Sequence, residues 1–183
     1  MTVHPPVRTR RGFTLMEAVA CMAVLSAMGS VVSTLLYRAS ETFRVTSTAA
    51  QLHAQAAAAL DPVERLLRSM PARPDGQAPH LTSITAQRIA WTDADGGALV
   101  WRSGSQLMLG FGGQASTPIL SDVTAFTVQP FDEDNQPIAT PVSALNLPLV
   151  RRVRLSVTVS RQGVSETLST KVFLRAMGRE VGP

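Results

Sequence analysis

The feature that most limits what this chain can fold into is an apolar run near its start. Between Phe13 and Leu36 there are 24 residues whose only charge is Glu17, and alanine, leucine, methionine and valine dominate them. An α-helix rises about 1.5 Å per residue, so the run reaches about 36 Å, and a bilayer core is roughly 30 Å thick. The run therefore predicts a transmembrane helix over residues 13–36.

The charges on either side of this run set its expected orientation. Arg8, Arg10 and Arg11 precede it, and all 13 acidic residues follow residue 12. Short segments rich in arginine stay in the cytoplasm, so residues 1–12 are expected to be cytoplasmic. The chain after the helix is expected to lie on the opposite side of the membrane. Four hydroxyl side chains inside the run can donate to carbonyls one turn back: Ser26, Ser30, Ser33 and Thr34.

The net positive charge of the chain comes mostly from residues 1–12, the leader. The formal charge is +4, with 17 basic and 13 acidic residues, but without the three leader arginines the balance is 14 against 13, or +1. Six Phe, two Trp and one Tyr are too few for a platform that stacks single-stranded bases. Nucleic acid is therefore not an expected partner.

Three export signals compete for the start of the chain, and Glu17 fits none of them. A secretory signal peptide, a twin-arginine signal and a lipoprotein signal ending at Cys21 each need an uninterrupted apolar core. The lipoprotein interpretation leaves only eight residues of core before Cys21. A carboxylate in such a core costs on the order of 3 kcal/mol on insertion scales.

A fourth interpretation accounts for the carboxylate. The residues Arg11, Gly12, Phe13, Thr14, Leu15 and Glu17, followed by an apolar helix, form a pattern that resembles the processing site of type IV prepilins and of the related pseudopilins. The resemblance implies that a membrane-embedded prepilin peptidase cuts between Gly12 and Phe13, and that the new amino-terminal Phe13 is methylated. It also implies a pilin-like fold, in which a long amino-terminal helix packs on a sheet.

The same resemblance implies a role for Glu17. Cleavage creates an ammonium group at Phe13, one helical turn from Glu17, and two isolated charges in or beside lipid are expensive. When they are paired, each offsets much of the desolvation cost of the other. In the family this pair forms between neighbouring subunits, so Glu17 is expected to be an assembly contact. The alternative from the residues alone is an acid that reaches out to the membrane interface.

The helix is expected to continue beyond the membrane, because residues 30–61 contain no Gly or Pro. We predict a helix from Phe13 to Leu60, a kink or break at Pro62, and a continuation to Ser69. An apolar stripe recurs at three- and four-residue spacing in residues 37–69 and just beyond, and it should lie against a sheet. Its members are Leu52, Ala56, Ala59, Val63, Leu66, Leu67 and Met70.

After this helix the periodicity changes to that of strands. Residues 70–80 contain three prolines and a glycine, which is typical of a linker. Six strands are predicted, at 88–92, 98–103, 106–111, 123–131, 150–160 and 165–175. They predict an α+β fold with a largely antiparallel β-rich domain over residues 81–177 and a tail over 178–183.

The second half of the chain extends the resemblance. Residues 119–137, 147–163 and 169–175 are similar in pattern and order to the late strands of pseudopilin J and related minor pilins. The chain lacks the mid-helix proline and the carboxy-terminal cysteine pair of many major pilins. Both differences favour a minor subunit that starts or tips a filament.

Motifs for catalysis, metal binding and cofactor binding are not expected in this sequence. It has no G-x-S-x-G, H-E-x-x-H or P-loop pattern, and the glycines of residues 110–115 predict a turn because Pro118 follows them. Asp132 and Asp134 could offer oxygens to calcium, although acidic runs between strands are more often solvated turns. The arginines at 151, 152 and 154 predict an exposed strand face, with an acidic partner as the alternative.

Together these features predict a minor pseudopilin of a type II secretion system, held in the inner membrane by one span with its β-domain in the periplasm. The expected partners are the prepilin peptidase, other minor and major pseudopilins or pilins, and the inner-membrane assembly platform; no cofactor is expected. A minor type IV pilin for pilus initiation, adhesion or DNA uptake is one alternative. A membrane-tethered periplasmic domain with an uncleaved anchor is the other.

Overall fold

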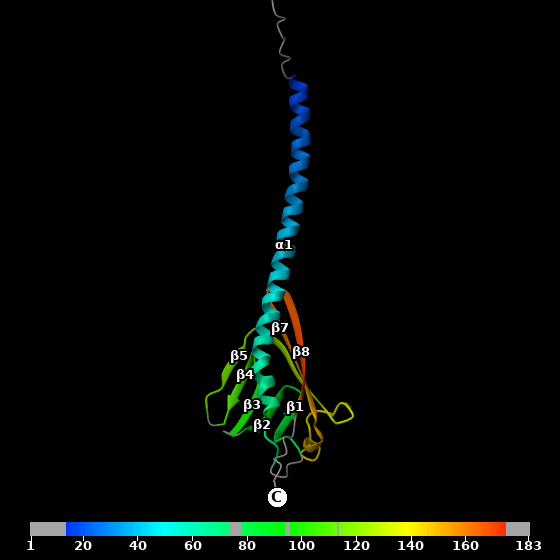
Figure 1. Cartoon of the computed structure of the whole chain (residues 1–183). Helices are drawn as coiled ribbons and strands as arrows, with labels where there is room; N and C mark the ends of the chain where they lie inside the picture. The colour runs from blue at the N-terminus through cyan, green and yellow to red at the C-terminus, as the bar shows by residue number, and fades with distance from the viewer. Residues whose placement is uncertain (1–13, 74–77, 94–95, 113, 175–183) are drawn as a thin grey trace, which may run out of the picture. The chain divides into compact units, whose positions relative to one another are not determined.

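The computed structural model describes residues 14–73, 78–93, 96–112 and 114–174. These residues form one α-helix, α1 (Leu15–Arg68), followed by eight strands and a short 3-10 helix, η1 (Leu147–Leu149) (Figure 1). The chain separates into two compact units with their boundary between Val45 and Thr46. The fold is therefore α+β with a long amino-terminal helix, as the sequence predicts.

The sequence predicts a kink or a break at Pro62, and the structure excludes the break, because helix α1 is continuous through this residue. A proline in a helix leaves the carbonyl four residues before it without a donor, which here is the carbonyl of Ala58. Ala58 is exposed, so water can reach that turn, while the neighbouring Ala59 and Val63 are buried and hold the helix in place. Packing on one face thus outweighs the lost hydrogen bond.

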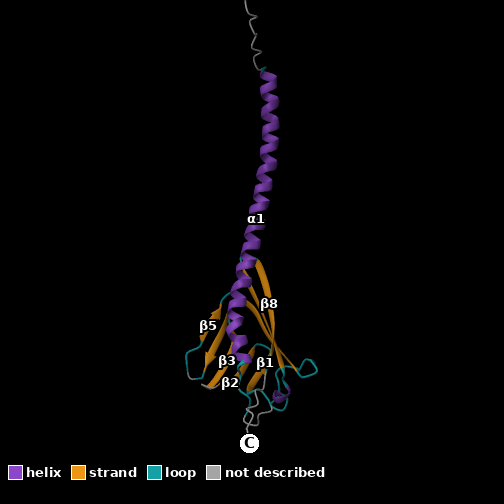
Figure 2. Ribbon diagram, in the orientation of Figure 1, coloured by secondary structure: helices purple, strands orange, loops and turns teal. Residues whose placement is uncertain are grey.

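The strands of the described residues form two antiparallel sheets, where the sequence predicts a single one (Figure 2). The first sheet has the order β1–β2–β3–β4–β5 and the second has the order β6–β7–β8. The bounds are β1 (Leu81–Thr85), β2 (Arg88–Asp93), β3 (Gly96–Ser103), β4 (Gln106–Phe111), β5 (Thr117–Leu120), β6 (Val123–Phe131), β7 (Arg152–Arg161) and β8 (Val164–Phe173).

Two strands, β1 and β5, are additional to the six expected, and each has a local reason for being missed. The pairing of β1 with β2 shifts register between Leu81 and Ser83, which breaks the alternation that marks a strand. Strand β5 has only four residues and contains Pro118. Proline is tolerated in a strand at a sheet edge, and β5 lies at the edge of its sheet.

The hairpins expected from the sequence are present. Strand β2 pairs with β3, and β7 pairs with β8 over ten residues from Arg161–Val164 to Arg152–Phe173. The two-residue loop between β7 and β8 has Gln162 at φ 52° and Gly163 at φ 79°. Two left-handed residues in a two-residue loop match the type I′ turn, whose twist suits a hairpin.

The apolar stripe of α1 packs into a core that residues of both sheets share. The predicted members Leu52, Ala56, Ala59, Val63, Leu67 and Met70 are buried, Leu66 is half-buried, and Leu60 is an additional buried residue. Ile89 and Val100 of the first sheet and Phe126 and Val157 of the second belong to the same cluster. Each fully buried side chain of this kind contributes about 1.5–3 kcal/mol, so the helix is an integral part of the β-domain.

The segment expected to be a linker has paired ends. Ala72 bridges Pro79, the amide of Arg73 donates to Ala78 O at 2.8 Å, and the amide of His80 donates to Pro71 O at 3.1 Å. Met70 and Ala78 are buried. Residues 74–77 lie outside the described residues, and at 71–73 and 78–80 the connection is anchored to the domain.

Candidate functional site

The amino end of α1 is capped by Thr14. The amides of Glu17 and Ala18 both donate to Thr14 O at 3.1 Å, and the amide of Glu17 also donates to the side-chain oxygen Thr14 Oγ1 at 3.3 Å. Threonine followed three residues later by glutamate is the capping-box spacing. Thr14 belongs to the processing motif, and its T-L-M-E spacing is also a local signal for this cap.

Glu17 lies in the first turn of α1 and is exposed. A carboxylate there interacts favourably with the positive end of the helix dipole. Among the described residues, no basic side chain forms an ion pair with it. The other predicted site residues, Gly12 and Phe13 and the leader arginines at 8, 10 and 11, lie outside the described residues.

The first part of α1 presents an unburied apolar surface. One 18-residue window has a mean hydropathy of 2.0 and no residue buried within the protein, so the helix is long and apolar enough to cross a membrane. Its large exposed side chains include Leu15, Met16, Val19, Met22, Val24, Leu25, Met28, Val31, Val32, Leu35 and Leu36. Apolar surface of this extent is typical of a segment that meets lipid or another protein.

Hydroxyl groups within this apolar surface are satisfied by the helix itself. Ser26 Oγ donates to Met22 O at 2.8 Å, and Thr34 Oγ1 donates to Ser30 O at 2.9 Å. The hydroxyl of Ser30 donates in the same way to Ala27 O at 2.8 Å. The prediction that hydroxyls bond back to carbonyls is thus confirmed for these three residues, and their polar atoms do not oppose burial in lipid.

Charged residues mark the end of the apolar surface. Arg38 is followed by an ion pair between Glu41 and Arg44, with 2.7 Å between Arg44 Nη2 and Glu41 Oε1. The hydrogen bond from Arg44 lowers the pKa of the Glu41 carboxyl. Both side chains are about half-exposed, as is expected of a solvated helix turn.

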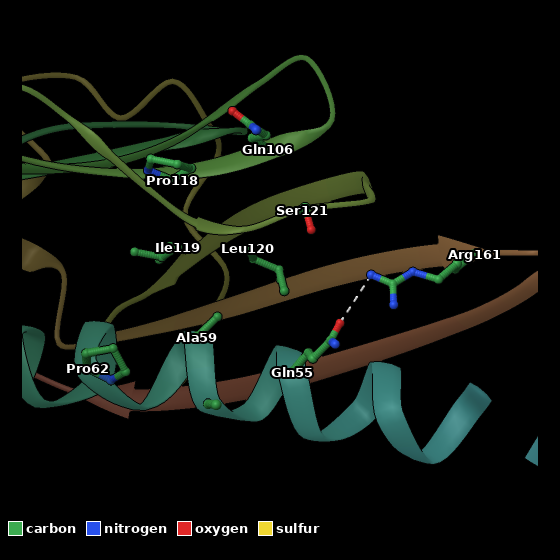
Figure 3. Close-up of a pocket in the computed structure, with 10 residues that line it drawn as sticks. Gln55, Ala59, Pro62, Gln106, Pro118, Ile119, Leu120, Ser121 and Arg161 are labelled. Atoms are coloured by element: carbon green, nitrogen blue, oxygen red, sulfur yellow. Dashed lines mark hydrogen bonds between the residues drawn. The ribbon is translucent and has the colours of Figure 1, made fainter. Parts of the chain in front are cut away.

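A groove lies between the carboxy-terminal part of α1 and the strands (Figure 3). It has a volume of about 610 Å³, and Ala59 and Pro62 line its helix side while Ile119 and Leu120 line its strand side. At one end Gln55 Oε1 lies 3.5 Å from Arg161 Nη2. The lining is mostly apolar, with one fixed polar end.

The predicted arginine face is present in part. Arg152 and Arg154 project from the outer face of β7, whereas Arg151 precedes the strand and its guanidinium donates to Pro148 O at 2.9 Å. Within the described residues, no group of three or more His, Cys, Asp or Glu is placed to hold a metal ion. In the acidic turn, the carboxylate of Asp132 accepts from the amide of Gln136 at 2.7 Å.

Two comparisons with known proteins bear on this chain. No protein-family model matches the sequence, and no curated protein matches it.

Proposed function

We propose that this chain is a minor pseudopilin, similar to pseudopilin J, held in the inner membrane with its β-domain in the periplasm. The observation that supports this function best is the position of the prepilin-like residues, which immediately precede α1 and occupy its first turn. The same helix carries an exposed apolar surface up to Leu36 and a buried face from Leu52 onward. One element thus combines a membrane-compatible segment with the core helix of a β-domain, as assembly of a pilin-like filament requires.

In this function the chain is itself the substrate of the prepilin peptidase. Cleavage between Gly12 and Phe13 removes the basic leader, and methylation follows at Phe13. The mature subunit then joins other minor and major subunits at the inner-membrane assembly platform, where it seeds or tips a short filament. The work of the protein is mechanical and needs no cofactor.

The exposed carboxylate of Glu17 supports the assembly step. It lies in the first turn of an apolar helix without a basic partner among the described residues. Moving such a charge into lipid is costly unless an opposite charge meets it. The ammonium of Phe13 on a neighbouring subunit provides that charge, and the cap formed by Thr14 keeps the carboxylate at the helix start.

Mass spectrometry of the membrane-extracted protein tests the processing step. A mature chain that begins with methylated Phe13 supports the proposal, whereas an intact amino terminus at Met1 or Thr2 contradicts it and favours an uncleaved anchor. The variant Gly12→Leu should block cleavage, because the peptidase must approach the scissile backbone closely. Gly29→Leu is a matched control, since a Cβ at Gly29 meets nothing within 4 Å.

A minor type IV pilin remains the second candidate, because the processing motif is common to both systems. Deletion of the gene separates the two functions. Loss of protein secretion with normal surface pili favours the pseudopilin, and loss of pili with normal secretion favours the pilin.

A further inference from the structure

Three cationic side chains gather at one end of the outer face of the sheet β6–β7–β8. In the strand register, Gln129 of β6, Arg154 of β7 and Lys171 of β8 form one row across the sheet. Phe131, Arg152 and Phe173 form the next row. We call Arg152, Arg154 and Lys171 the basic face.

Aromatic rings hold the basic face in place. Lys171 Nζ lies 4.3 Å from the centroid of the Phe131 ring, and Arg154 Cζ lies 5.3 Å from the same centroid. Arg152 Cζ lies 5.5 Å from the centroid of Phe173. These distances are within the range of cation–π contacts, so part of the rotamer entropy of three long side chains is already lost in the free protein.

The basic face has no acidic partner within the described residues. Arg152 Nη1 donates to the backbone oxygen of Glu133 at 3.2 Å, and Lys171 Nζ donates to Asn135 Oδ1. None of the ion pairs among the described residues involves these three cations. Because Arg154 and Lys171 lie directly opposite each other, their like charges repel, and this repulsion destabilises the free sheet.

Within the part of the chain that the structure describes, the backbone of β8 beside these cations pairs with a strand on one side only, that of β7. Strand β8 lies at the edge of its sheet and spans ten residues without a proline or a register shift (Figure 1). The amide of Leu174 donates to Arg151 O at 2.9 Å, which makes Arg152–Phe173 a non-hydrogen-bonded pair. The pair types alternate along the two strands, so Arg154–Lys171, which is two residues away from Arg152–Phe173, is also a non-hydrogen-bonded pair.

This pairing places the outward-facing N–H and C=O groups of β8 next to the cationic side chains of the basic face. In a non-hydrogen-bonded pair, the N–H and C=O groups point away from the partner strand. The backbone groups of Lys171 and Phe173 thus face the free edge, beside the Lys171 and Arg154 side chains. A long, regular edge strand of this kind is a template for pairing with another chain.

We propose that β8 accepts an extended acidic segment of a partner protein as an added strand, with one carboxylate in the row of Lys171 and Arg154 and another two residues away on the same face. The main-chain hydrogen bonds along β8 supply affinity, and the basic face selects for acidic side chains. The added carboxylates also relieve the repulsion within the Arg154–Lys171 pair. The unpaired edge favours a peptide strand over an anionic lipid headgroup, which has no backbone to pair with it. This inference does not depend on how the amino terminus is processed.

Fluorescence anisotropy with the full chain in a neutral detergent tests this proposal. The probe is a labelled, end-capped peptide, Thr-Val-Glu-Val-Glu-Val-Thr, compared with a peptide in which lysine replaces glutamate. A third peptide carries N-methyl groups on its backbone nitrogens, which removes the donors for strand pairing and leaves the protein unchanged. We expect the dissociation constant of the acidic peptide to be at least about tenfold lower than that of either comparison peptide.

Variants of the protein identify the cations. Lys171→Glu should raise the dissociation constant of the acidic peptide about tenfold or more, and Arg154→Gln should raise it severalfold. Arg88→Gln is the matched control, because Arg88 is an exposed strand arginine of the other sheet, and it should leave binding unchanged. Far-UV circular dichroism of each variant confirms that the sheet is retained.

Several results would overturn the proposal. One is an absence of binding, and another is equal binding of the acidic and lysine peptides. If N-methylation has no effect and glycerol phosphate displaces the peptide, the basic face is a general anion site and strand addition is wrong. If the chain instead forms a dimer that Lys171→Glu dissociates, a second copy occupies the edge and an acidic partner is excluded.

Discussion

Two nitrogens of the Arg161 guanidinium bind the carboxylate of Asp122. Nε donates to Asp122 Oδ2 at 2.8 Å, and Nη2 lies 2.7 Å from the same oxygen. Asp122 joins the two sheets, because it stands between β5 and β6, and Arg161 ends β7. Nη2 of Arg161 also lies 3.5 Å from Gln55 Oε1 of α1 (Figure 3). One arginine therefore connects the sheet junction to the helix at the end of the groove.

Two substitutions of Asp122 should distinguish the contribution of its charge to stability from the contribution of its backbone conformation. Asp122 has φ 59°, a left-handed conformation that asparagine tolerates better than alanine does. The ion pair is 38% and 39% exposed, so its loss in Asp122→Asn should cost about 1 kcal/mol or less. Asp122→Ala should cost a further 1 kcal/mol or so, because of the strained backbone. Urea unfolding measures both, and equal values would contradict the backbone argument.

Gly112 and Gly97 lie close together, and only Gly112 has no room for a side chain. A Cβ at Gly112 would lie 2.8 Å from the backbone nitrogen of Gly97, whereas a Cβ at Gly97 would meet only Trp91 O, at 4.0 Å. Gly112→Ala should therefore destabilise the domain by about 1–3 kcal/mol, the range for overpacking. Gly97→Ala is the matched control and should be tolerated. A smaller effect for Gly112 than for Gly97, measured by thermal unfolding, would contradict this contact.

Truncation should define where the folded domain begins. The last large exposed apolar side chain of α1 is that of Val45, and the first buried residue of the helix is Leu52. Fragments that start at Tyr37 or at Thr46 should both be soluble and should unfold cooperatively at the same midpoint. A fragment that starts at His53 loses Leu52, which should cost about 2–5 kcal/mol. An insoluble fragment from Thr46, or one without a cooperative transition, would show that the domain needs the earlier part of the helix.

Two candidate roles of Glu17, as the last residue of a capping box and as the proposed assembly contact, predict different outcomes for Glu17→Gln. Glutamine satisfies a capping box as well as glutamate does, so a residue needed only for the helix start tolerates this change. A residue that must meet an ammonium in lipid does not, because charge assistance makes such bonds strong. We expect both Glu17→Gln and Glu17→Ala to be processed and inserted, and to copurify with other filament subunits less well than the parent, with Ala the more defective.

Immunoblots for processed protein provide the control for that experiment. A reduced amount of mature chain would indicate a processing defect and would contradict the expected separation of the two steps. Normal copurification of the Glu17→Ala variant would show that the carboxylate has no part in assembly.

Much of the fold was predictable because it follows from local patterns. The stripe from Leu52 to Met70 repeats at helical spacing, and alternation over 123–131 marks a strand whose bounds the structure reproduces. Prediction was wrong where tertiary context outweighed a local rule. Pro118 weakens a strand signal but is tolerated at an edge, and Pro62 is tolerated in a helix because the neighbouring residues are buried.

The candidate site was predictable only in its chemical character. The isolated charge of Glu17 in an apolar run is visible in the sequence, and so is the Arg152–Arg154 spacing on one face of a strand. The position of Lys171 opposite Arg154, with both over Phe131, depends on the β6–β7–β8 register and on strands far apart in the chain. No local pattern specifies which strands become neighbours or which of them is left at an edge.

The sequence by itself was therefore sufficient to predict the apolar helix, its acidic first turn and the strand-forming segments. These features depend on hydrophobic periodicity and on turn residues, and both are local properties of a few consecutive residues. The division into two sheets, the single core between them and α1, and the free edge of β8 come from packing. They arise because one helix face must be buried by distant strands at once, and the free energy of that burial depends on how all of the elements fit together.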